Sequence, residues 1–199
     1  MSVASQIGSS ASLASKYKLA YALCGAAGAA LSLYVASDAT GLCGALLAVL
    51  MTAIALRDAH DFIIPDQYSA AAFVVGLAAA ILAAEGDAIW AFAAALLRAA
   101  MLALAFLTIR WAYKRLRGRH GLGLGDVKLA GVAGAWLDWT MLPIAIEIAA
   151  LSALAAVLVD QLITRRTLKA TTRLPFGLFF APSIWTGWLL QTALPWPGP

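Results

Sequence analysis

Long runs of apolar residues alternate with short polar clusters along almost the whole chain. Apolar runs of about 18 residues with few charges are typical of helices that cross a membrane. The runs fall at residues 19–36, 41–56, 68–84, 88–109, 124–137, 141–163 and 176–194. The pattern predicts an all-α fold, a polytopic membrane bundle of about six to seven transmembrane helices. We expect a cytoplasmic tail at residues 1–18 and a single membrane domain at residues 19–199.

The composition agrees with a protein built for lipid. Hydrophobic residues make up 63% of the 199 residues, charged residues make up 12%, and the mean hydropathy is +0.86. Ordinary soluble domains carry about 25% charged residues. A very apolar soluble helical bundle is therefore disfavoured.

Basic residues fall at alternate connections between the predicted helices. They are Lys16, Lys18, Arg57, Arg110, Lys114, Arg115, Arg117, Arg119, Arg165, Arg166, Lys169 and Arg173. The intervening connections carry Asp38, Glu85, Asp87 and Asp138 and no lysine or arginine. Because cytoplasmic loops are enriched in Lys and Arg, we expect the N-terminus in the cytoplasm and the C-terminus outside. The net charge of +4 then reflects topology, and nucleic-acid binding is not indicated.

Several other residues have structural interpretations. The first 15 residues lack the basic start of a secretory signal, so the first apolar run is expected to act as an uncleaved anchor. Cys24 and Cys43 fall in different predicted helices, which favours apolar packing over a disulfide. His60 and His120 lack the spacing of metal ligands, so no metal site is predicted. Five tryptophans near predicted boundaries are interpreted as interfacial anchors: Trp111, Trp136, Trp139, Trp185 and Trp188.

The segment GLGLGDVKLAG, residues 121–131, places Asp126 and Lys128 directly against an apolar run. Its glycines do not fit a dinucleotide fingerprint, and no G-K-[ST] follows, so phosphate binding by a nucleotide loop is not indicated. One interpretation is a flexible linker in which Asp126 is the N-cap of the next helix. The other is that the glycines allow a substrate to approach a carboxylate closely. Lys128 is expected either to orient Asp126 or to contact anionic headgroups.

A second acidic cluster, Asp58, Asp61 and Asp66, follows the second apolar run. By the topology above, this cluster and Asp126 lie at the same face of the membrane. Ionisable residues near hydrocarbon are costly and mark functional sites. Two carboxyl groups that meet in a partly dry site share a proton, so that one deprotonates water while the other polarises a carbonyl. This is the chemistry of aspartic proteases, and it needs neither a metal nor a cofactor.

Three segments resemble the type IV prepilin peptidase family. The residues from Gly123 to Asp126 are similar to the family's G-x-G-D signature and continue into VKLAGVAGAWL. DAHDFIIPD at residues 58–66 resembles the family's first catalytic region, in which the catalytic aspartate lies seven residues before a proline. Counting back from Pro65 selects Asp58. LPFGLFFAP at residues 174–182 resembles the Pro-Phe-Gly segment, so that the resemblance covers roughly residues 40–190.

The resemblance implies a membrane aspartic endopeptidase with Asp58 and Asp126 as its catalytic residues. The residues expected to form or support the active-site loop are Gly123, Gly125, Lys128, Asp61, Pro65 and Asp66. Such an enzyme removes the basic leader of type IV prepilins or pseudopilins at the cytoplasmic face of the bacterial inner membrane. The expected partners are this substrate and the lipid bilayer.

The chain departs from the longer members of the family in one respect. Those members carry paired C-x-x-C motifs in a cytoplasmic loop and also N-methylate the mature pilin, whereas this sequence has no C-x-x-C. Neither zinc nor methyl transfer follows, and no cofactor is expected. The sequence is therefore similar to the short, peptidase-only branch, such as the enzymes that serve tight-adherence pili.

Two other functions are open. A small transporter or channel subunit would use Asp58 and Asp126 as a proton or cation relay, although a relay would distribute its acids across the membrane. A non-catalytic scaffold for pilus assembly would tolerate neutral residues at both positions. Arg98 and Glu147 lie within predicted membrane helices, and we expect them to pair with each other. The alternative is that Arg98 holds a carboxylate of the substrate.

Overall fold

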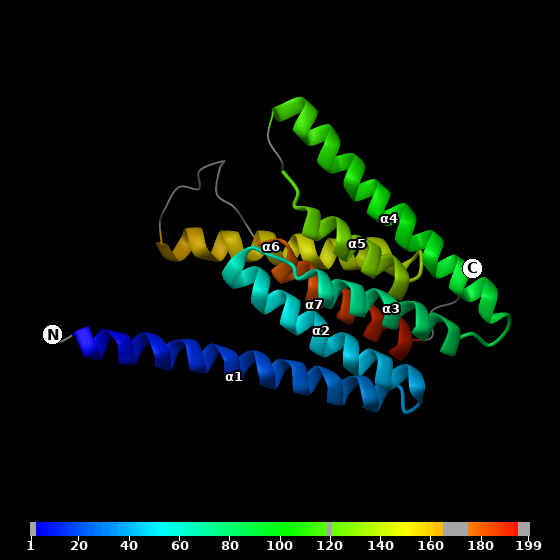
Figure 1. The fold of residues 1–199 in the computed structure, drawn as a ribbon, viewed down its shortest axis with the longest axis horizontal. Coiled ribbons are helices and arrows are strands. Elements are labelled where there is room, and N and C mark those ends of the chain that lie inside the picture. The colour runs from blue at the N-terminus through cyan, green and yellow to red at the C-terminus, as the bar shows by residue number, and fades with distance from the viewer. Residues whose placement is uncertain (1–2, 119–120, 165–174, 195–199) are drawn as a thin grey trace.

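The computed structural model describes the backbone of residues 3–118, 121–164 and 175–194, and these residues form seven α-helices (Figure 1). In chain order they are α1 (Val3–Val35), α2 (Ala39–Asp61), α3 (Asp66–Leu82), α4 (Ala88–Arg117), α5 (Leu124–Trp136), α6 (Met141–Thr164) and α7 (Gly177–Ala193). Each predicted apolar run corresponds to one of these helices, which confirms the all-α membrane bundle. By length and composition α2, α4 and α6 are long enough to cross a membrane, and two shorter apolar helices are α3 and Leu19–Val35 of α1.

Part of the predicted charge pattern lies outside the described residues. This holds for Arg119, His120, Arg165, Arg166, Lys169 and Arg173, and for the side chains of residues 1–18. The backbone of α1 nevertheless begins at Val3, so the helix includes most of the expected tail. The orientation of the chain in the membrane stays a prediction.

Two helices continue past the apolar runs that predicted them. The runs stop at residues 56 and 109, but α2 ends at Asp61 and α4 at Arg117. Charged residues such as Lys and Arg are good helix formers, so the helices end only where the backbone turns left-handed, at Phe62 (φ 54°) and Gly118 (φ 70°). The extension places Asp58 within the last turns of α2 rather than in a loop.

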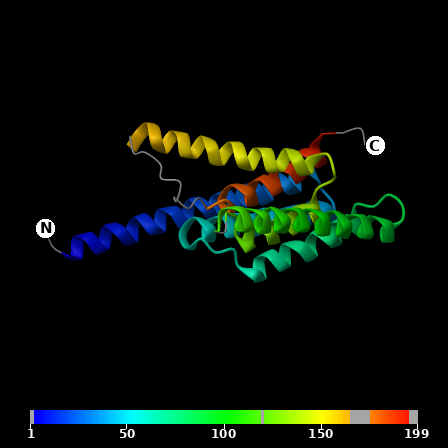
Figure 2. The ribbon, with the colours of Figure 1, turned by 90° about the horizontal axis from the view of Figure 1, so that it is seen from above.

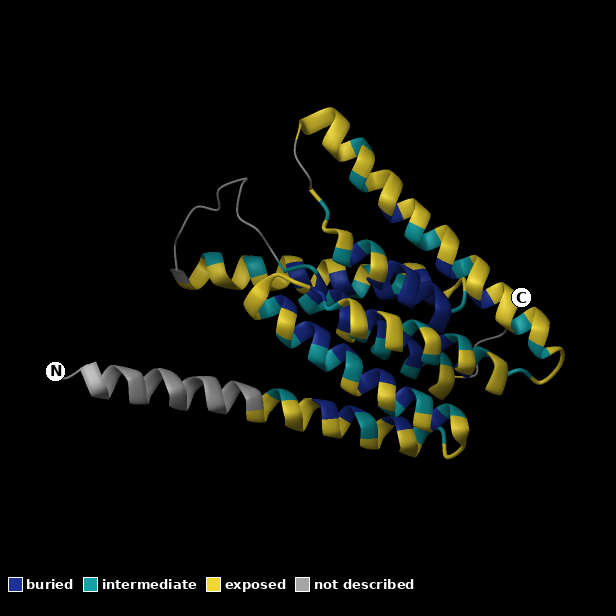
Figure 3. Cartoon of the chain, viewed as in Figure 1, coloured by how far each residue is buried: buried dark blue, intermediate teal, exposed yellow. Residues whose placement is uncertain are grey.

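The centre of the bundle is α5. Its residues from Leu129 to Trp136 are all buried, and α3, α4 and α7 surround the helix. Small residues allow this close packing, because a Cβ added to Gly134 would stand 2.5 Å from the backbone of Ala99 in α4. The buried residues accordingly gather around α5 in the middle of the molecule (Figure 3).

The outer faces of the bundle are apolar, as expected in lipid. Large exposed hydrophobic side chains on α4 include Leu96, Leu97, Leu104 and Leu107. Seen from above, α3 and α6 lie on opposite sides of the bundle with α7 between them (Figure 2). The helix α1 packs mainly on α2 at the edge, and α6 packs on α7.

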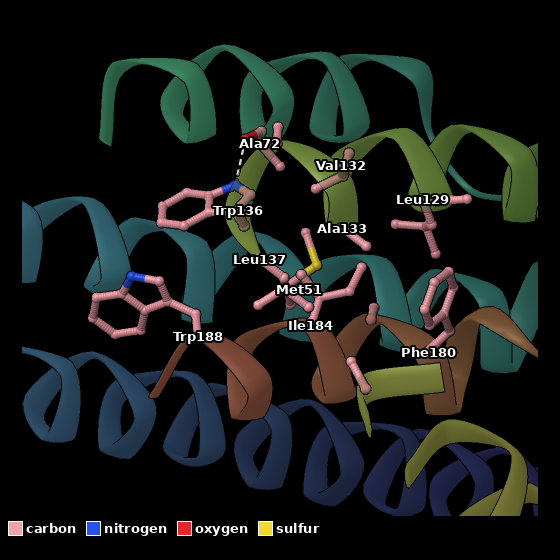
Figure 4. Packing of buried hydrophobic residues seen from close by; sticks show 14 of the residues in the cluster. Met51, Ala72, Leu129, Val132, Ala133, Trp136, Leu137, Phe180, Ile184 and Trp188 are labelled. Carbon is pink, nitrogen blue, oxygen red and sulfur yellow. Dashed lines mark hydrogen bonds between the residues drawn. The ribbon is translucent and has the colours of Figure 1, made fainter. Parts of the chain in front are cut away.

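Two tryptophans expected at the membrane boundary lie in the core instead. Trp136 and Trp188 are buried and meet edge to face, with ring centroids 6.2 Å apart (Figure 4). The Trp136 indole N–H donates to the carbonyl of Ala72 at 2.8 Å, which satisfies the polar end of the ring away from water. Trp111 and Trp139 are exposed, as interfacial anchors would be.

Arg98 and Glu147 do not form the expected ion pair. Arg98 Nε donates to the carbonyl oxygen of Gly134 at 3.3 Å, whereas Glu147 lies on an exposed face of α6. Gly134 is in the last turn of α5, and the amide four residues on, that of Asp138, donates to Gln191 Oε1 at 3.2 Å instead. Arg98 thus satisfies a helix-end carbonyl that lacks its helical donor.

This arrangement predicts independent effects of the two charges. Arg98→Gln should cost about 1–3 kcal/mol, because a carbonyl at the helix end loses its donor. Glu147→Gln should change stability by less than about 0.5 kcal/mol, since the side chain is exposed. Thermal unfolding in detergent of the two single variants and the double variant measures this. Effects that sum support the structure, and a double variant more stable than the sum would show that the two charges do meet.

Candidate active site

Asp58 is a buried carboxylate in the last turns of α2, with 6% of its surface exposed. Its Oδ2 accepts a hydrogen bond from the backbone N–H of Leu178, at 2.9 Å. The backbone N–H of Gly177 also donates to this carboxylate. Both amides belong to the first turn of α7. The N-terminal end of a helix carries unpaired N–H groups and partial positive charge, so α7 is oriented to hold this carboxylate.

Gly177 makes this approach possible. A Cβ at this position would stand 2.8 Å from Asp58 Oδ2 and 2.8 Å from Ile64 Cδ1, too close for any side chain without a shift. The LPFG stretch, which the sequence analysis noted by resemblance only, therefore brings a helix end with a glycine against Asp58. Residue 174 of that stretch lies outside the described residues.

Asp126 is the second buried carboxylate, with 8% of its surface exposed. It lies in the first turn of α5, and its Oδ2 accepts a hydrogen bond from the backbone N–H of Gly123 at 3.0 Å. The residue at the N-cap position is Gly123 itself. The interpretation of Asp126 as the N-cap is therefore wrong: it lies three residues further on and folds back onto the N-cap amide, as the acidic half of a capping box does.

The two carboxylates converge around Ile64, which lies in the short loop between α2 and α3. Its Cδ1 is 2.8 Å from where a Cβ of Gly125 would stand, just as it is at Gly177. Ile64 thus lies between the first turns of α5 and α7. Asp58 Oδ2 is also 2.8 Å from where a Cβ of Gly177 would stand, so Asp58 and the first turn of α5, which carries Asp126, both adjoin Ile64.

Arg110 of α4 is a basic residue beside the loop that leads to Asp126. Its Nη1 donates a hydrogen bond to the carbonyl of Leu122. That contact ties the loop before the G-x-G-D segment to α4. The sequence pattern indicates for Arg110 only a place in a basic connection.

The other acids of the first cluster turn away from the pair. Asp61 forms an ion pair with Arg57 at 3.1 Å, and their side chains are 45% and 60% exposed. Asp66, in the first turn of α3, forms an ion pair with Lys128 Nζ. Lys128 therefore neither orients Asp126 nor faces headgroups alone, but connects the starts of α3 and α5. The remaining predicted residue, Pro65, occupies the N-cap position of α3.

Three features of this site were missed by sequence reasoning: the amides of α7, Ile64 and Arg110. Ile64 lies inside the DAHDFIIPD stretch, and Gly177 closes the Pro-Phe-Gly segment. Both segments resemble the family, but the resemblance assigns no function to these two residues. Arg110 carried none, because one basic residue among several cannot be singled out from sequence. Among the described residues, no group of three His, Cys, Asp or Glu side chains comes together as metal ligands would.

Comparison with known proteins agrees with the motifs. Residues 45–158 match the type IV leader peptidase family. The chain is 31% identical to the prepilin leader peptidase/N-methyltransferase of Aeromonas salmonicida strain A449, over 94% of this chain and 65% of that protein. It is 38% identical to the protein of the same name from Burkholderia pseudomallei strain 1026b, over 81% of this chain and 47% of that protein.

A shorter similarity concerns leader peptidase HopD of Escherichia coli, which is 46% identical over 38% of this chain and 48% of that protein. The chain spans less than two thirds of the length of these relatives. No solved structure matches the chain significantly. The family match covers more than half of the residues, including both buried aspartates, and the chain therefore belongs to the type IV leader peptidase family.

Proposed function

We propose that the chain is a membrane aspartic endopeptidase that removes the basic leader of type IV prepilins or pseudopilins, with Asp58 and Asp126 as its catalytic pair. The observation that carries the proposal is a pair of buried carboxylates, each fixed by a backbone N–H group, on elements that both adjoin Ile64. Prepilins as substrates are suggested by the names of the Aeromonas and Burkholderia relatives.

The chemistry follows from two carboxyl groups that repel each other. Close carboxylates in a poorly hydrated site do not both ionise readily, so the pair holds one proton. The ionised member takes a proton from water, and the water oxygen attacks the carbonyl carbon of the scissile peptide bond. The protonated member donates to the carbonyl oxygen. When the C–N bond breaks, a proton passes to the leaving amine and the pair returns to its starting state.

Neither aspartate is assigned to one of the two roles. A coupled pair titrates as a unit, and both members accept a hydrogen bond from a backbone amide. The two carboxyl groups are thus held in similar ways, which suits a pair that exchanges roles during the cycle.

We place the pair at the cytoplasmic face of the bacterial inner membrane, with the N-terminus of the chain in the cytoplasm. The support is the segregation of Lys and Arg to alternate connections. A topology reporter fused after Arg119 should read cytoplasmic, and one fused after Asp87 should read external. Two fusions that read on the same side would overturn this orientation.

The function is tested by cleavage of a prepilin in membranes that contain the chain. Gel mobility should report conversion of the precursor to its mature length, and a metal chelator should leave the rate unchanged, because the proposed chemistry uses no metal. A chain that moves protons or cations but leaves the precursor intact would instead support the carboxylate relay. Loss of cleavage on chelation, restored by added metal, would contradict the two-aspartate mechanism.

A further inference from the structure

The core helix α5 ends with a side chain that packs against the middle of its neighbour α3. The indole of Trp136, the last residue of α5, donates to the carbonyl of Ala72 (Figure 4), and a Cβ on Gly76 would stand 2.6 Å from its indole nitrogen. The helix α3 continues beyond both of these residues, to Leu82. The connection between α5 and α6, residues 137–140, follows directly after Trp136. It lies at the end of α5 opposite to Asp126.

This connection carries one charged residue, Asp138. Asp138 accepts hydrogen bonds through Oδ1 from the backbone N–H groups of Thr140, at 3.1 Å, and Met141, at 2.8 Å. Arg98 of α4 is half-buried, and no ion pair joins it to Asp138. Charged groups inside a membrane protein require a cavity that admits polar groups.

Such a cavity is present between the ends of α3, α5 and α7 and the start of α4. Its volume is about 430 Å³, and Arg98, Asp138, Gln191 and Trp136 line its polar part. The walls toward the outside are formed largely by alanines of α3 and α4, among them Ala80 and Ala94. The cavity is thus a well with small apolar walls and an arginine among its lining residues, and we refer to it as the Arg98 well.

The arginine in the well has unused hydrogen-bonding capacity. A guanidinium has five N–H donors, and among the hydrogen bonds of the described residues only Nε is engaged, by Gly134. The carboxylate of Asp138, which could have bound the others, caps the first turn of α6 instead. A cation with free donors, in a well beside lipid, is matched by an anion with several acceptor oxygens.

We propose that the Arg98 well binds the phosphate group of a phospholipid from the leaflet opposite to Asp58 and Asp126. Arg98 donates to the phosphate oxygens, and the headgroup enters from the membrane past the alanines of α3 and α4. Exposed Ile89 and Trp90, on α4 near the rim, contact the lipid outside the well. This site is independent of the proposed protease chemistry, since it lies at the other end of the helices.

Thermal unfolding of the purified full chain in detergent tests the proposal. Added phosphatidylglycerol should raise Tm by about 5 °C when its concentration is well above its Kd. Diacylglycerol, which has the acyl chains without the phosphate, should not raise it. Arg98→Gln should lose the rise, and Arg98→Lys should keep part of it. Arg57→Gln is the matched control, because Arg57 pairs with Asp61 far from the well, and it should respond as the wild type does.

Two further variants keep the test decisive if Arg98→Gln does not fold. Ala80→Leu and Ala94→Leu fill the well while leaving Arg98 in place, and each should abolish the rise. An equal rise in these variants, or in Arg98→Gln, would overturn the site. A rise with diacylglycerol would show that acyl chains alone are bound, against the proposal. A rise with inorganic phosphate alone, lost in Arg98→Gln, would assign the well to the free anion and overturn the lipid as its occupant.

Discussion

Asp58→Asn and Asp126→Asn should each reduce leader cleavage about a thousandfold or more. Asparagine is nearly isosteric with aspartate but holds no shared ionisable proton, so either change removes the proton transfer on which the reaction depends. Residues that act as one unit give non-additive losses. The double variant should therefore be no slower than either single variant. The measurement is the rate at which a prepilin is converted to its mature length in membranes.

Asp61→Asn is the matched control for these variants. Asp61 lies one turn from Asp58 on the same helix, but its side chain is exposed and pairs with Arg57. Exposed ion pairs contribute little, about 0–1 kcal/mol, so the variant should cleave at close to the wild-type rate. An inactive Asp61→Asn beside an active Asp58→Asn would show that the wrong aspartate was chosen. Normal cleavage by both Asp58→Asn and Asp126→Asn would end the protease hypothesis.

Gly177→Ala should lower the cleavage rate about a hundredfold while the chain still folds. The new methyl group would stand 2.8 Å from Asp58 Oδ2 and from Ile64 Cδ1, so both side chains must move. A displacement of about 1 Å within a catalytic arrangement commonly costs a factor of about a hundred. Both atoms belong to side chains, which can shift without unfolding the helix, and membrane insertion and Tm should change little.

Gly86→Ala is the control for this substitution. Gly86 lies in the turn between α3 and α4, and a Cβ there would meet nothing within 4 Å. It should cleave as the wild type does. If Gly177→Ala also retains full activity, the close contact between α7 and Asp58 is unimportant for catalysis. The catalytic role of Asp58 would then be judged only from the cleavage rate of Asp58→Asn.

The apolar runs predicted the helices well, because lipid requires every spanning backbone segment to satisfy its own hydrogen bonds. The starts of α4, α5 and α6 agree with the predicted runs to the residue. The ends of α2 and α4 do not, since charge marks where hydrocarbon stops and not where a helix stops. Trp136 and Trp188 were misplaced for a related reason: a position near a predicted boundary does not tell whether an indole faces lipid or a neighbouring helix.

The candidate site was predictable only in part. The spacing to Pro65 and the G-x-G-D segment selected Asp58 and Asp126, and the structure buries both, on elements that adjoin Ile64, while their catalytic role stays a prediction. The acidic cluster itself was misleading, because neighbours in sequence occupy different faces: Asp61 and Asp66 turn to basic partners. The contact of Asp58 with Leu178 joins residues 120 positions apart, and no local pattern reports such a pairing.

The position of α7 in the chain has a consequence for biogenesis. The helix that supplies amides to Asp58 is made after both aspartates, although Asp58 itself belongs to α2. The helix α5, which brings Asp126, has 13 residues and a buried surface along its second half, so it needs α3, α4 and α7 around it before it settles in the membrane. The candidate site is therefore incomplete until α7 has been made. A chain that stops before α7 carries both aspartates without the amides that hold Asp58, so we expect it to lack the proposed activity.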